Sequence, residues 1–103
     1  MKYLQFFFIF FIFSSNVNAN QLMDVATKAD NLKAAASTCY LSVLSSKRHA
    51  IAKLYLRANK TLDDGVGFIK SNQIGTAISM LQIANGLYVA MIGFGRQLGG
   101  NSC

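Results

Sequence analysis

The chain has 103 residues, of which 52% are hydrophobic and 14% charged, and its ten basic and four acidic residues give a net charge of +6. This composition is too apolar for an intrinsically disordered protein, and the length allows one small domain. The sequence contains no proline, which argues against a β architecture with many turns. We therefore expect a compact helical domain.

The first 19 residues have the pattern of a cleavable export signal. Lys2 supplies a positive charge, residues 6–13 form an unbroken apolar run, and Val17 and Ala19 occupy the −3 and −1 positions of a cleavage site. The alternative is a retained membrane anchor, but a spanning helix needs ~20 apolar residues. We predict a signal peptide over 1–19 and a single helical domain over 20–103, which is periplasmic or secreted.

Export changes how the two cysteines are interpreted, because thiols pair and persist as disulfides in an oxidising compartment. We predict a bridge between Cys39 and Cys103 that contributes ~4 kcal/mol by closing a long loop. The alternative is a reactive thiol. No second cysteine lies at CxxC spacing to support it.

Apolar and small residues recur at helical spacing in the first part of the exported chain. The positions fall three or four apart without interruption: Leu22, Val25, Ala29, Leu32, Ala36, Cys39 and Val43. This pattern predicts a helix over 21–45 that ends near Ser45 and Ser46 and carries Cys39 on its buried side.

Residues 47–60 hold five cations and no acidic residue. As a helix over 48–60 the segment is amphipathic, with one apolar side formed by Ile51, Leu54, Tyr55 and Ala58. The opposite side, which we call the basic face, consists of His49, Lys53, Arg57 and Lys60. We interpret the basic face as a solvated surface or a docking site for an acidic protein, and the alternative is contact with an anionic membrane.

Residues 61–64 (TLDD) match the S/T-x-x-D signal for the start of a helix. They predict a third, short helix over 62–71, in which Asp63 and Asp64 satisfy the amides of the first turn. The alternative is a catalytic pair of carboxylates. Gly65 and Gly67 weaken this helix.

Residues 71–95 contain no formal charge, and this length is enough to cross a bilayer. However, Gln82 and Asn85 lie near the middle, and small or polar residues form a stripe of Gly75, Ser79, Gln82, Gly86 and Gly93. We predict a helix over 73–96 that is buried in the core, and the alternative is a transmembrane helix. The glycine-rich residues 99–102 would form a flexible tail that lets Cys103 reach Cys39.

The sequence offers little material for catalysis. The exported part has four aspartates, one histidine and no glutamate, and neither Gly65-x-Gly67 nor the Gly93/Gly95 pair has the context of a phosphate-binding loop. We expect no metal, no cofactor, no nucleic-acid partner and no enzymatic activity.

Together these features predict an all-α fold, a small bundle of three to four antiparallel helices closed by one disulfide. The expected function is binding of an acidic protein partner in the cell envelope, as an inhibitor or immunity protein or as an accessory of a secretion or conjugation system. The alternative is a cationic membrane-active or toxic protein with residues 74–95 inserted in the membrane, or with peripheral contact to anionic lipid.

Overall fold

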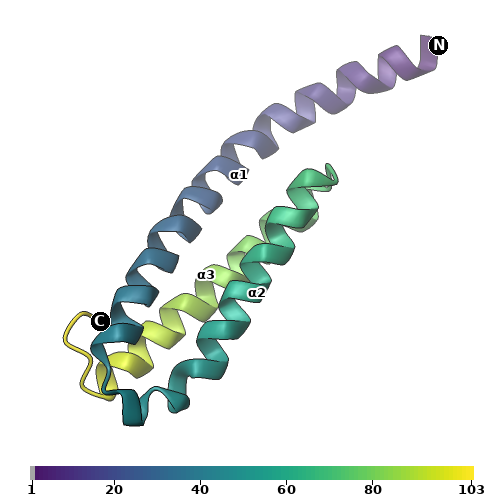
Figure 1. Cartoon of the computed structure of the whole chain (residues 1–103). Coiled ribbons are helices and arrows are strands. Elements are labelled where there is room, and N and C mark those ends of the chain that lie inside the picture. Colours follow the sequence, from purple (N-terminus) through teal and green to yellow (C-terminus); the bar gives the residue numbers. More distant parts are fainter. Residues whose placement is uncertain (1) are drawn as a thin grey trace.

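The computed structural model describes residues 2–103 of the chain and the side chains of residues 19–103. The described part is all-α, with the element order α1 (Lys2–Ser42), a short 3₁₀ helix η1 (Ser45–Lys47), α2 (His49–Lys70) and α3 (Ile74–Gln97). The chain runs along α1, back along α2 and again along α3, so sequential helices are antiparallel and α1 is parallel to α3 (Figure 1). The predicted all-α bundle is confirmed.

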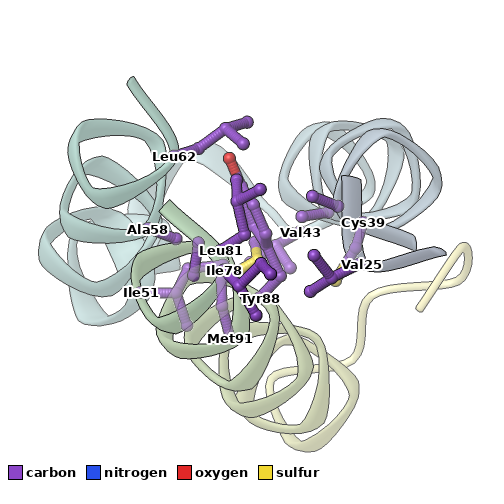
Figure 2. Close-up of a cluster of buried hydrophobic side chains, with 13 residues drawn as sticks. Val25, Cys39, Val43, Ile51, Ala58, Leu62, Ile78, Leu81, Tyr88 and Met91 are labelled. Carbon is purple, nitrogen blue, oxygen red and sulfur yellow. The ribbon is translucent and has the colours of Figure 1, made fainter. Parts of the chain in front are cut away.

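α3 is the helix that holds the bundle together. It packs extensively against both α1 and α2, whereas α1 and α2 have few contacts with each other. Large side chains of α3, above all Tyr88, fill the space between α1 and α2 (Figure 2). The fully buried core is mostly aliphatic, with Tyr88, Ile51, Leu81, Met91, Val43 and Cys39 as its largest members.

The apolar periodicity predicted for α1 is confirmed. Val25, Ala29, Ala36, Cys39 and Val43 are buried, and the two remaining positions pack against the core as partly buried residues. Leu22 is the first described side chain that contacts this core. Cleavage after Ala19, which remains a prediction, would therefore leave the described core contacts of α1 in place.

The prediction of a separate short helix over 62–71 is wrong, because α2 continues without a break from His49 to Lys70. Thr61 does not cap a helix. Its hydroxyl donates a hydrogen bond to the carbonyl oxygen of Arg57, one turn earlier, at 2.8 Å. Gly65 does not end the helix either, and Leu81 of α3 packs against the space that a side chain would need there. The bundle therefore has three long helices.

The prediction that the helix over 73–96 is buried in the core is wrong for one side of α3. Gly75, Ser79, Gln82 and Gly86 are exposed, and the positions of a Cβ at Gly75, Gly86 and Gly93 have no neighbouring atom within 4 Å. Exposed hydrophobic residues Ile83, Val89 and Phe94 lie beside this stripe. The small residues thus face outward and do not mediate packing against α1 or α2.

The antiparallel helices α2 and α3 end in the same backbone motif. At the end of α2, Asn72 has a positive φ of 63° and the Gln73 amide donates to the Phe68 carbonyl. At the end of α3, Gly99 has a φ of 87° and the Gly100 amide donates to the Gly95 carbonyl. These are Schellman motifs, so the segment after α3 begins as an ordered turn.

Candidate functional site

The basic face lies on the solvent side of α2. His49, Lys53, Arg57 and Lys60 are all exposed, while Ile51 and Ala58 on the opposite side of the helix are fully buried. Packing against α3 fixes the rotation of α2, so the four side chains form one strip on the outer surface. The structure thus confirms the placement of these residues and does not test what binds them.

Acidic side chains leave most of the basic face uncompensated. In the part of the chain that the structure describes, which includes all four aspartates, the one ion pair joins Lys60 Nζ to Asp64 Oδ2 at 3.5 Å. Both side chains are exposed, so this pair contributes less than about 1 kcal/mol. His49, Lys53 and Arg57 therefore keep their charge or donors available to a partner.

An exposed leucine, which the sequence analysis missed, lies within the basic face. Leu56 is 65% exposed, and it is three residues from Lys53 and four from Lys60 on the same helix. Residues three and four apart are neighbours on a helix surface. The same spacing in the sequence could have identified this residue. An exposed apolar side chain next to two lysines suits contact with a surface that is both apolar and acidic.

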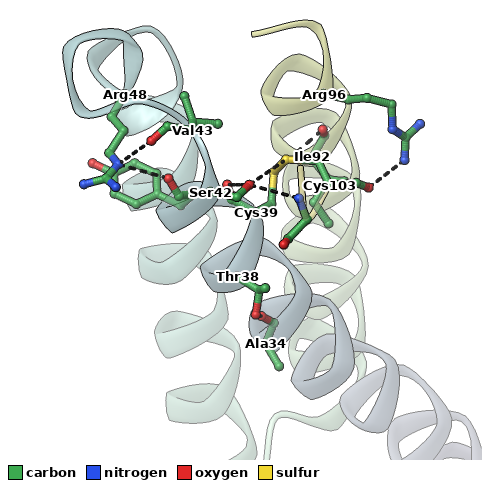
Figure 3. The surroundings of a disulfide bond; sticks show 11 residues. Ala34, Thr38, Cys39, Ser42, Val43, Arg48, Ile92, Arg96 and Cys103 are labelled. Carbon is green, nitrogen blue, oxygen red and sulfur yellow. Dashed lines mark hydrogen bonds between the residues drawn. A yellow bond between two sulfur atoms is a disulfide. The ribbon is translucent and has the colours of Figure 1, made fainter. Parts of the chain in front are cut away.

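Arg48 is a cation of the same segment that serves the fold. Its Nε donates to the carbonyl oxygens of Tyr40 at 3.1 Å and Val43 at 2.9 Å (Figure 3). An Nη donates to the Leu41 carbonyl at 2.9 Å. The guanidinium also lies 5.6 Å from the centre of the Tyr40 ring, which stacks on Tyr55 at 4.8 Å. Arg48 thus closes the end of α1 and is not free to bind a partner.

The predicted disulfide between Cys39 and Cys103 is present (Figure 3). Its sulfur atoms lie against the backbone of Gly95, where an added Cβ would be 2.4 Å from Cys39 Sγ and 2.9 Å from Cys103 Sγ. Gly95, which the sequence analysis considered only as part of a phosphate-binding loop, is therefore the position at which the absence of a side chain leaves room for the disulfide against α3. Around it, the Ser102 amide donates to the Ser42 hydroxyl and Arg96 donates to the Cys103 backbone oxygen.

One partly buried side-chain hydrogen bond connects α3 to α2. The Tyr88 hydroxyl donates to Asn59 Oδ1 at 2.5 Å, and the tyrosine is fully buried. Burial, together with the nearby Tyr55 and Asp63, raises the pKa of Tyr88 to about 12 from 10.0. Because its pKa is raised, the Tyr88 hydroxyl stays protonated near neutral pH and serves the fold as a hydrogen-bond donor.

A groove of about 500 Å³ lies between α1 and α3. Its lining consists of Gln21, Asp24, Val25, Lys28, Gln82, Asn85, Gly86 and Val89. Asn85 is the one buried polar side chain among the described residues, with 7% exposure. Its Nδ2 donates to the Val25 carbonyl at 3.4 Å, while its Oδ1 is buried without a hydrogen-bond partner. The sequence analysis noted Asn85 only as an argument against a membrane span.

A second hollow, of about 480 Å³, includes Asp63 and Asp64 near the turn between α2 and α3. Both aspartates are exposed, and no histidine or cysteine joins them. No group of three or more metal-ligating side chains occurs in the described residues.

Comparison with known proteins found no family model, curated protein or solved structure that matches this chain.

Proposed function

We propose that this protein is an exported, non-enzymatic binding protein of the cell envelope that docks an acidic protein partner on the basic face of α2. The proposal is supported by the basic face itself: three of its four members form no ion pair among the described residues, and the exposed Leu56 lies beside them. Charged groups at the edge of an interface steer encounter, and a central apolar side chain supplies contact that excludes water.

A site-specific cross-link tests this proposal. A photo-reactive residue at position 56 is expected to give one defined adduct in cells, and the same residue at position 33, exposed on α1, is the positional control. The variant Lys53→Glu/Arg57→Glu should lose the adduct. The variant Lys33→Glu/Lys70→Glu changes the charge by the same amount at exposed positions outside the basic face and should keep it.

Kinetics of the isolated complex give a second readout. Because steering charges act on diffusional encounter, the Lys53→Glu/Arg57→Glu variant should associate more slowly, and its association rate should depend less on salt. An adduct that forms equally well in this variant and the control would contradict the proposal.

Membrane insertion is the second candidate, and one observation favours it. α3 is long and apolar enough to cross a membrane, and only 39% of its most apolar 18 residues are buried in the bundle. For α3 to span a bilayer, it would have to separate from α1 and α2, or the whole bundle would have to insert with it. Membrane-fraction recovery after a carbonate wash, and dye release from anionic but not neutral vesicles, would support this candidate over docking of a protein.

A further inference from the structure

We infer that the groove between α1 and α3 is the interface of a two-fold symmetric homodimer, in which the outward face of α3 in one copy packs into the same groove of the other. The proposal is independent of the basic face, which lies on α2. It rests on the unpaired oxygen of Asn85, on the charges that border the groove and on the open space over Gly86.

The Asn85 side chain supplies the first argument. No protein group among the described residues donates a hydrogen bond to the buried Asn85 Oδ1, and burying an amide oxygen without a donor is unfavourable because the oxygen loses its hydrogen bonds to water. Asn85 lines the groove and uses one of its two amide N–H groups on the Val25 carbonyl. The terminal torsion of asparagine is soft, so the amide can turn toward the groove when a second amide approaches. A buried asparagine at a helix interface is a known means of fixing register between copies.

The charges that border the groove in one copy of the chain are complementary to the same charges in a second copy. Asp24 and Lys28 are one turn apart on α1, both exposed, and the structure gives no ion pair between them. A two-fold axis perpendicular to the helices, at the level between these residues, places Asp24 of each copy beside Lys28 of the other. Because Val25 and Asn85 are joined by a hydrogen bond, the same axis passes close to Asn85 and brings its amide toward the Asn85 of the second copy.

The surface of α3 allows the necessary close approach. Gly86 lines the groove, is exposed and has nothing within 4 Å of its Cβ position, and the neighbouring Val89 is 55% exposed. No charged residue occurs on α3 before Arg96, so a second copy of the helix meets no like charge along this face. Small residues at such a contact let two backbones come close together.

Two pairs of variants test the dimer by sedimentation over about 1–200 µM, a range chosen for a dissociation constant in the micromolar class. The protein is used as the expression host exports and processes it. Gly86→Leu should raise the dimer dissociation constant at least ~10-fold by overpacking the contact. Gly67→Leu, at an exposed helical glycine of α2 that also has nothing within 4 Å, should leave it unchanged.

The charge swap is the sharper test. Asp24→Lys and Lys28→Asp should each weaken the dimer by placing like charges across the axis, and the double variant should restore it. Helicity by circular dichroism should be the same for all four proteins, since both side chains are exposed in the monomer. A wild-type protein that is monomeric at every concentration, or a dimer that Gly86→Leu affects no more than Gly67→Leu, would overturn the inference. So would a double variant that dimerises no better than the single variants.

Discussion

Replacing Gly95 by alanine should prevent the disulfide from forming in its present place and so remove its contribution to stability. The new Cβ would lie 2.4 Å from Cys39 Sγ, well inside van der Waals contact, so the bridge and α3 cannot both keep their places. If the bridge fails to close, the unfolded chain regains the entropy of a loop that spans 64 residues, which is worth ~4 kcal/mol at 25 °C. Alanine returns at most ~1 kcal/mol through its helix propensity.

The expected net loss is therefore ~3 kcal/mol, a large part of the stability of so small a domain. Urea unfolding under oxidising conditions measures it, with Gly93→Ala as the matched control because its Cβ would have open space on the same helix. The control should be unchanged or slightly more stable. In excess reductant neither protein has a bridge, so the loss of ~4 kcal/mol should disappear, and only the helix propensity of alanine and the contact of its Cβ with Cys39 Sγ should still distinguish the two proteins. A Gly95→Ala protein that forms the disulfide and unfolds at the wild-type urea concentration would refute this reasoning.

Three further outcomes are expected. Arg48→Gln should cost ~1–3 kcal/mol in urea unfolding by leaving carbonyls at the end of α1 without donors, whereas Lys47→Gln, at an exposed neighbour, should cost less than ~0.5 kcal/mol. Thr61→Ala should be neutral or stabilising within ~0.5 kcal/mol, because Thr61 is inside α2, and a loss of ~1 kcal/mol would instead indicate a cap. The raised pKa of Tyr88 favours the folded state while the phenol is neutral, so this contribution is complete below about pH 10 and is lost as the pH rises toward 12. Absorbance titration of tyrosinate should show a late step that Tyr88→Phe removes.

Much of the fold was predictable because the signals were local and repeated. The three-and-four spacing from Leu22 to Val43 predicted the second half of α1 and its buried side, and the two cysteines of the chain allowed one intramolecular bridge. The basic face was predictable for the same reason, since its members follow the turn of a single helix. These features need no knowledge of how the helices are arranged.

The errors came from patterns whose meaning depends on tertiary packing. Thr61 followed by two aspartates fits a helix start and also fits the middle of a helix, where a threonine hydroxyl bonds one turn back. Gly65 favours a break by propensity, but Leu81 packs against it and α2 continues. The stripe through Gly86 suits a helix contact, and the sequence could not show that this side of α3 faces away from α1 and α2.

The parallel arrangement of α1 and α3 has an electrostatic consequence. Two parallel helices bring ends of like polarity together, and each carboxyl end carries the equivalent of about half a negative charge. The ends of α1 and α3 lie side by side at the disulfide (Figure 3). An arginine occupies each one: Arg48 donates to the last carbonyls of α1, and Arg96 lies in the last turn of α3. The bridge thus joins two helix ends of like polarity, and two of the ten basic residues of the chain place positive charge at these ends.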